Sequence, residues 1–141
     1  MSTVEAVIAL LREGPFKRVD GALALAQLAT EPTVALPAAF VLEEGSTTQD
    51  AAQGSQIFEQ VETATIAVVV VVGGDAARRG AAERALEDLA EAVVSRLFAA
   101  AIPGLERPLA YQGGQLLGLD GGRVTRILRF RAVRRLRLIV S

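Results

Sequence analysis

The sequence has no cysteine, no histidine and no tryptophan, and two of these absences exclude whole classes of chemistry. Without cysteine, the chain cannot form disulfides, thiolate zinc sites or a cysteine nucleophile. Without histidine, it cannot build a Ser-His catalytic pair or an imidazole metal site. Most hydrolase and metalloenzyme mechanisms are excluded, so we expect a protein that is not an enzyme and uses no metal or cofactor.

Long hydrophobic runs are also missing. The longest, residues 66–72, is far shorter than the roughly 20 residues that a membrane-spanning helix needs. The N-terminus carries Glu5 and no early basic residue, whereas a secretory signal peptide begins with basic residues before its apolar stretch. We therefore expect a soluble protein that is made in the cytoplasm.

The composition is that of one folded domain spanning residues 1–141. Of the 141 residues, 51% are hydrophobic and 22% charged, which is typical of a globular chain. Periodicity, caps and turn residues predict helices at 4–11, 22–29 and 76–100, and strands at 16–19, 38–43, 56–72, 109–119 and 124–140. The adjacent strands predict an α+β fold, a mostly antiparallel β-sheet with one long and one or two short helices packed on it.

Two of the predicted strands, 38–43 and 56–72, indicate a long projecting hairpin. Residues 44–55 between them are polar and contain no large apolar side chain, so we expect a mobile loop that contributes nothing to a core. The first half of the 56–72 strand mixes polar and apolar residues, and its second half is continuously apolar. This pattern predicts that only the second half is covered on both faces.

The net charge of −1 conceals an uneven distribution along the chain. Residues 1–120 contain 8 basic and all 16 acidic residues, and residues 121–141 contain 7 arginines and no acidic residue. Lys17 is the only lysine, and arginine is the cation better suited to pairing with carboxylates at interfaces. We expect much of this imbalance to be cancelled between neighbouring copies, with cancellation within one chain as the alternative.

The last predicted strand has two different faces. Its even-numbered residues, such as Leu128 and Phe130, are mostly apolar and predict the core side. Its odd-numbered residues include Arg123, Arg129, Arg131, Arg135 and Arg137. Three interpretations stay open for this odd face: strand-pair partners within the chain, the acidic surface of another copy, or nucleic acid, which the acidic balance of the whole domain disfavours.

No segment has the spacing of a catalytic or phosphate-binding motif. We expect Gly73, Gly74 and Asp75 to form a strand-to-helix turn with Asp75 as the helix cap, since the lysine of a phosphate-binding loop is missing. The carboxylates Glu43, Glu44, Glu59 and Glu62 have no histidine or lysine companion, so we interpret them as solvated or interface charges.

In the order of its predicted elements and in several sequence segments, the chain resembles the tail terminator proteins of long-tailed bacteriophages. The resemblance covers nearly the whole sequence and is carried by FKRVDGALALAQL, LPAAFVLEEG, the segment from QVETATIAVVVVVGGD to VVSRL, and YQGGQLLGLDGGRV. The departures are an unusually arginine-rich last strand and the absence of the tryptophan or other aromatic residues that the family frequently has near it.

The resemblance implies a structural virion protein at the neck end of the tail, made in the host bacterial cytoplasm. Such proteins form a homohexameric ring that caps the tail tube, stops its polymerisation and joins it to the head connector, with DNA passing through the lumen without sequence-specific binding. We expect Arg123, Arg129, Arg131, Arg135 and Arg137 at a subunit or lumen interface. The expected tail-tube contacts are Glu44, Ser46, Thr47, Thr48, Gln49, Asp50 and Gln53.

Other functions remain possible from the sequence. The chain could be a related tail tube or neck protein that completes the head. It could also be a small ligand-binding regulatory module, which would be a monomer or dimer with a metabolite pocket. A nucleic-acid-binding protein would show steeply salt-dependent affinity for DNA.

Overall fold

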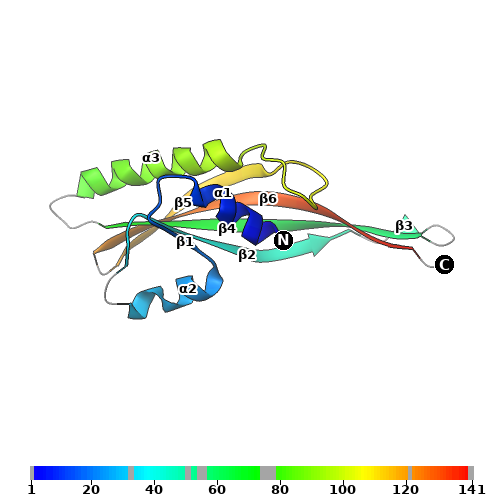
Figure 1. The fold of residues 1–141 in the computed structure, drawn as a ribbon, viewed down its shortest axis with the longest axis horizontal. Coiled ribbons are helices and arrows are strands. Elements are labelled where there is room, and N and C mark those ends of the chain that lie inside the picture. Colours follow the sequence, from blue (N-terminus) through cyan, green and yellow to red (C-terminus); the bar gives the residue numbers. More distant parts are fainter. Residues whose placement is uncertain are drawn as a thin grey trace.

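The computed structural model describes residues 2–31, 34–49, 52–53, 57–73, 79–120 and 122–139. A sheet runs through its full length (Figure 1). The strands follow the order β1-β2-β4-β6-β5, and β3 pairs with β4. β1 is parallel to β2, and every other described pair is antiparallel. The strands are β1 (Arg18–Asp20), β2 (Ala38–Thr48), β3 (Ala52–Gln53), β4 (Ile57–Gly73), β5 (Ala110–Asp120) and β6 (Arg123–Ile139).

Helices lie on both faces of this sheet. α1 (Thr3–Arg12) and α3 (Arg79–Leu97) lie on one face, and α2 (Ala22–Gln27) with the short 3-10 helix η1 (Leu28–Thr30) lies on the other (Figure 1). The predicted α+β architecture, with one long helix and short helices on a mostly antiparallel sheet, is confirmed. No helix in the described ranges is long and apolar enough to cross a membrane.

The first helix begins at a capping box. Ser2 Oγ accepts a hydrogen bond from the Glu5 backbone N–H at 3.1 Å, and the Glu5 carboxylate accepts one from the Ser2 N–H at 3.2 Å. Both bonds satisfy donors that have no partner inside the helix. Val7 and Leu11 are fully buried against the sheet, so the apolar spacing in the sequence identifies the packed face correctly.

The sheet separates two apolar clusters because successive side chains of a strand point to opposite faces. Val68 and Val70 of β4 pack in the larger cluster with Leu128 and Phe130 of β6 and with α1 and α3. On the other face, Val69 and Val71 belong to a smaller cluster with Phe40 and Ile127, against which Leu25 and Leu28 pack. The second half of β4 is thus covered on both faces, as its apolar run predicts.

Several predicted boundaries are wrong. β2 does not end at Glu43 but continues to Thr48, since Gly45 and Thr48 are paired with β4 beyond a bulge at Glu44. The predicted loop therefore begins later than residue 44. The polar side chains of residues 44–48 led to the wrong prediction. A strand forms through backbone hydrogen bonds with its neighbour and does not need apolar side chains.

Helix α3 and strand β1 also differ from the prediction. α3 ends at Leu97 rather than at residue 100, and Ala99 has a φ of 61° and donates its N–H to the Leu109 carbonyl. β1 is shifted to Arg18–Asp20. The predicted cap Asp75 and the predicted helix start at residue 76 lie outside the described residues.

The two faces of β6 are assigned correctly only in part. The even residues Val124, Leu128, Phe130 and Ala132 are buried as predicted, but Leu136 is 44% exposed. The odd residue Ile127 is buried, because α2 covers that end of the supposedly solvated face. Parity determines which face a side chain occupies, whereas burial depends on how far the helices extend along the sheet.

Candidate functional site

The face of the sheet opposite α1 and α3 is covered by α2 at one end only (Figure 1). We call its uncovered part the open face. It is formed by side chains that alternate with the core residues of three strands: Thr47 of β2, Glu59, Val61, Thr63 and Thr65 of β4, and Arg129, Arg131, Val133, Arg135 and Arg137 of β6.

Arg129 is held by a carboxylate from the bulge in β2. Its Nε donates to Glu44 Oε1 at 2.7 Å, and its Nη2 donates to Glu44 Oε2 at 3.3 Å. This bidentate geometry is the strong form of the arginine–carboxylate pair. The hydrogen bonds that Arg129 donates to Glu44 raise the pKa of Arg129. The two residues are 85 positions apart, and the bulge turns Glu44 onto the open face.

Arg135 and Arg137 share a carboxylate from β4. Arg135 lies 3.0 Å from Glu59 Oε2, and Arg137 Nε lies 3.2 Å from Glu59 Oε1. Arg135 also contacts Glu106, from the loop after α3, at 3.0 Å. Its hydrogen bond to Glu106 lowers the pKa of that carboxyl below its ordinary value of 4.5. Three of the five predicted interface arginines therefore have carboxylate partners within the chain.

The other two predicted interface arginines differ from these three and from each other. Arg123 donates to the backbone carbonyls of Leu28 at 2.9 Å and Glu31 at 3.3 Å, so it fastens β6 to the end of η1 and does not lie on the open face. Arg131 is exposed and has neither an ion pair nor a hydrogen bond within the described part of the chain. It is the one open-face arginine with its charge available.

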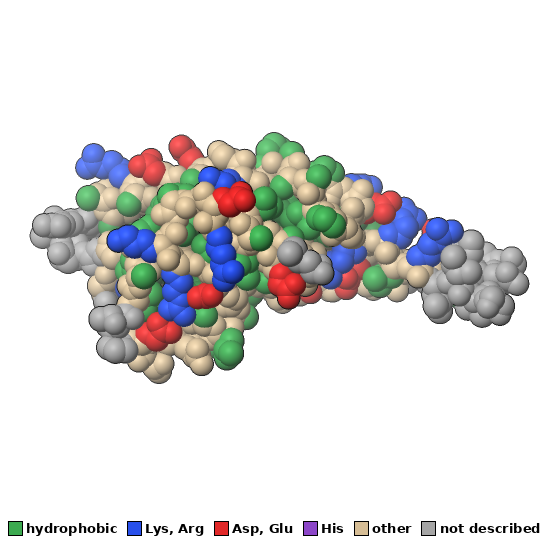
Figure 2. Space-filling view, viewed as in Figure 1, with side chains coloured by type: hydrophobic (Ala, Val, Ile, Leu, Met, Phe, Trp, Pro, Cys, Tyr) green, Lys and Arg blue, Asp and Glu red, His purple; other side chains and the backbone are tan. Residues whose placement is uncertain are grey.

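The ion pairs continue on the opposite face of the same strands. Arg134 contacts Glu43 of β2 and lies 3.6 Å from Glu62 of β4, and Ser46 donates to Glu62 at 2.9 Å. Figure 2 shows Lys and Arg side chains beside Asp and Glu side chains along the extended end of the sheet. The positive charge of the last strand is thus partly balanced by acidic residues of the same chain. Cancellation within one chain was the alternative to cancellation between copies.

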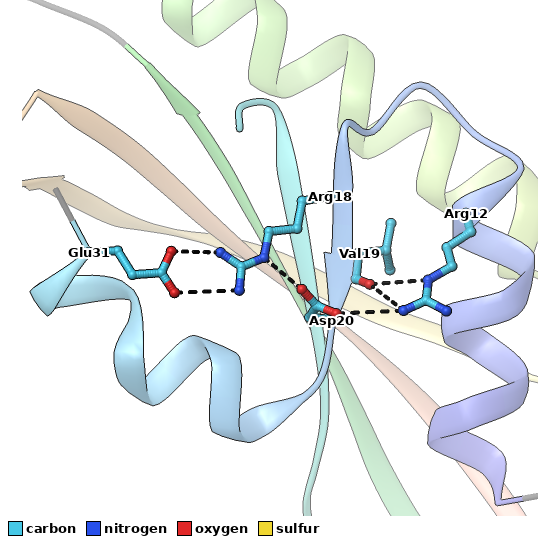
Figure 3. A network of polar contacts seen from close by, with 5 residues as sticks. All are labelled: Arg12, Arg18, Val19, Asp20 and Glu31. Carbon is cyan, nitrogen blue, oxygen red and sulfur yellow. Dashed lines mark hydrogen bonds and ion pairs between the residues drawn. The ribbon is translucent and has the colours of Figure 1, made fainter. Parts of the chain in front are cut away.

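A further network fastens the first helix and strand (Figure 3). Arg18 of β1 donates to Asp20 at 2.6 Å and to Glu31 at 2.8 Å, and these bonds raise its pKa. Arg12 of α1 donates to the Val19 carbonyl at 3.3 and 3.1 Å. These contacts join α1, β1 and the segment after η1, so their role is structural.

The predicted tail-tube residues that are described extend along the sheet from the bulge in β2 to β3. Ser46, Thr47 and Thr48 are exposed in β2, and Gln49 follows them, with its N–H donating to the Val61 carbonyl. Gln53 lies in β3, and Glu44 faces Arg129. Asp50 lies outside the described residues. Most of these residues belong to a paired strand end rather than to a loop.

Among the described residues, no group of three or more acidic side chains is placed to hold a metal ion. A shallow polar groove of about 560 Å³ does lie on the open face. Its lining consists of Glu44, Gly45, Ser46, Thr47, Thr63, Thr65, Gln112 and Arg129. Most of its lining residues carry hydroxyl, amide or charged groups, and the Ser46 hydroxyl donates to Glu62.

The sequence analysis missed two sets of surface residues. The odd position of Glu59 places it on the same face of the sheet as the odd-numbered arginines of β6. Its pairing with Arg135, 76 positions away, could be found only from the register of the two strands. Leu116 and Leu117 are 51% and 52% exposed. Two adjacent leucines in one strand were the available signal, since one of them must leave the core face.

The chain matches a known protein family. The family model described as phage tail terminator protein matches residues 1–138, nearly the whole chain. No curated protein matches. The matched range contains every described strand except the last residue of β6, so it includes the open face and both sheet edges.

Proposed function

The chain belongs to the phage tail terminator family, a family of structural virion proteins, and we propose that six copies form a ring on the head-proximal end of the tail tube. The ring stops polymerisation of the tube and offers the surface on which the head connector docks. Genome DNA passes through its lumen, and the protein is made in the cytoplasm of the host bacterium. The family match over residues 1–138 is the observation that carries this proposal.

Exposed apolar side chains support a ring. Leu116 and Leu117 lie on the edge strand β5, and Leu136, 44% exposed, lies near the other end of β6. Leu116 pairs with Arg126 of β6, ten residues from Leu136, so the two patches are about 33 Å apart at 3.3 Å per residue. Two different apolar patches at separate ends of one subunit favour a head-to-tail contact, in which one patch of each subunit meets the other patch of its neighbour. Repetition of such a heterologous contact can close a ring.

The extended end of the sheet supports contact with the tube. It contains 45–48 of β2, β3, 57–63 of β4 and 133–139 of β6, and it projects past the helices (Figure 1). We call it the arm. Thr48 and Gln49 are exposed there. Its strands are joined by backbone pairing and carry ion pairs between their side chains. Such a preformed polar arm suits docking on a second protein at little cost in ordering.

The proposal is tested with the tail tube protein of the same phage. Tubes are polymerised with increasing amounts of this chain, and their lengths and ends are measured by negative-stain microscopy. We expect shorter tubes whose ends carry a ring, with sixfold mass by light scattering of the capped species. Tubes that keep growing with bare ends at saturating protein would overturn the proposal.

A matched pair of variants tests the arm. Thr48→Arg with Gln49→Arg should lower the affinity for tube ends about tenfold or more, or about 1.4 kcal/mol, because two charges lose water at the contact. Ala9→Arg with Ala26→Arg adds the same charge at exposed helical positions away from the arm. Equal capping by both variants would contradict a role of the arm.

A further inference from the structure

The open face carries a row of arginines at alternate positions of one strand. Arg129, Arg131, Arg135 and Arg137 point to the same side of β6, and neighbours two residues apart are about 6.6 Å apart along the strand. Guanidinium groups bind phosphate through a planar fork of donors. A row of them on an exposed surface, interrupted at Val133, favours a polyanion over a single small anion.

The neutral groups of this face fit the same kind of partner. Thr47, Thr63 and Thr65 line the polar groove, together with Gln112. Hydroxyl and amide groups are common donors to the phosphate oxygens of nucleic acids, and they bind without reading base sequence. The exposed leucines Leu116 and Leu117 line neither this groove nor the arginine row.

The carboxylates on this face act against strong binding. Glu44 holds Arg129, while Glu59 and Glu106 hold Arg135. A phosphate must compete with a carboxylate already at hydrogen-bond distance, and it meets the carboxylate charge as repulsion. Among the described arginines of the open face, Arg131 is the one that offers an unpaired charge.

We propose that the open face contacts the sugar-phosphate backbone of nucleic acid, and that Glu44, Glu59 and Glu106 mask its arginines so that the contact is weak and brief. This deepens the proposed function, since a ring on the path of the genome must let DNA pass without retaining it. The masking itself belongs to a single chain and does not require the ring.

The test removes the masking carboxylates in the full chain. The variant Glu44→Gln/Glu59→Gln/Glu106→Gln is titrated against a labelled 20-base-pair DNA duplex by fluorescence anisotropy at 50 and 200 mM NaCl. We expect at least a tenfold gain in affinity over the unaltered chain at 50 mM salt. The log–log salt dependence should steepen by about 0.9 for each arginine that gains a phosphate.

A control with the same charge change separates masking from net charge. Glu87→Gln/Asp88→Asn/Glu91→Gln removes three exposed carboxylates of α3, on the other side of the sheet. We expect less than a threefold gain in DNA affinity for it. Adding Arg131→Gln to the unmasked variant should reduce its salt slope by about 0.9. An equal gain in both triple variants would overturn the proposal.

Folding and ring formation are read separately from DNA binding. Glu44→Gln alone frees Arg129 at an exposed position and should give a smaller gain of the same sign, even where the triple variant is less stable. If the unmasked variant folds and gains no affinity, the inference fails, whether or not rings form. If it gains affinity while the unaltered chain forms no rings on tubes, the inference stands and the ring proposal fails.

Discussion

At the scale of single residues, the arginines of this chain act according to the acceptor that each one meets. Arg18 and Arg123 bind carboxylates or carbonyls around η1 and join elements. Arg129 and Arg135 bind carboxylates across strands on a half-exposed surface. Exposed ion pairs contribute little to stability, so their main effect is on which charges the surface presents.

The carboxyl of Glu106 gives a direct check of one such pair. Its pKa in the folded protein should lie below 4.5, because Arg135 stabilises the ionised form. Titration of side-chain carboxyl carbons by NMR measures this value. Arg135→Gln should return the pKa to near 4.5, whereas Arg137→Gln, which removes a contact to Glu59 only, should leave it low.

The pair of Glu106 and Arg135 also makes the stability of the fold depend on pH. Since the folded pKa is lower than the unfolded one, the pair stabilises the fold above pH 4.5, and this stabilisation is lost as the pH falls through the folded pKa. Acidification from pH 5 should therefore lower the melting temperature of the unaltered chain more than that of Glu106→Gln. An identical acid response of the two proteins would contradict the pairing.

At the scale of elements, β5 is an edge strand interrupted by two irregularities. Its register with β6 shifts between Tyr111 and Gly113 and between Leu116 and Gly118, and both glycines have φ of 130°. Bulges of this kind twist an edge and discourage unspecific pairing with other strands. β5 is therefore a poor template for unspecific pairing with another strand.

One substitution should have opposite effects in β5 and α3. A Cβ at Gly114 would lie 2.7 Å from Leu128 Cδ2 and 3.0 Å from the Tyr111 hydroxyl, whereas one at Gly80 meets nothing within 4 Å. We expect Gly114→Ala to lower the free energy of unfolding by about 1–3 kcal/mol through overpacking. Gly80→Ala should raise it by about 0.5–1 kcal/mol, because alanine favours the helix.

Urea unfolding followed by circular dichroism measures both changes. The two variants add the same methyl group, so each serves as the control for the other. A Gly114→Ala protein as stable as the unaltered chain would mean that Leu128, which is fully buried, moves aside without cost.

At the scale of the whole molecule, the helices cover the sheet unevenly. One end of β4 lies between two apolar clusters, and the arm lies beyond all helices (Figure 1). A single chain thus combines a part with a buried apolar core and a part whose strands are exposed. This arrangement is expected of a subunit that assembles with others.

The β5 leucines test this view of assembly. Leu116→Gln with Leu117→Gln should leave the monomer folded, since both side chains are half-exposed, and should reduce rings on tube ends, because burying a leucine contributes roughly 1.5–3 kcal/mol. Leu23→Gln is the control, since Leu23 is 74% exposed on α2. Ring counts in negative stain provide the measurement; equal losses in both variants would rule out a specific role of β5.

Much of the fold was predictable from local pattern. The order of the longer helices and strands and the doubly covered second half of β4 are confirmed, because each depends on spacing along a short segment. The short strand β3 lies in a segment that was predicted to be a loop. The end of β2 was predicted wrongly, because the backbone pairing of Thr48 with Glu62 leaves no trace in polarity.

By itself, the sequence determined the secondary structure, the absence of cysteine and histidine chemistry, and the arginine-rich face of the last strand, since all of these are properties of composition and period. Only the tertiary structure decided which carboxylates mask those arginines and which leucines are exposed. Glu44 and Arg129 meet across 85 residues, and such a pairing depends on strand register, a bulge and the reach of a helix, which are set by long-range hydrogen bonding and packing.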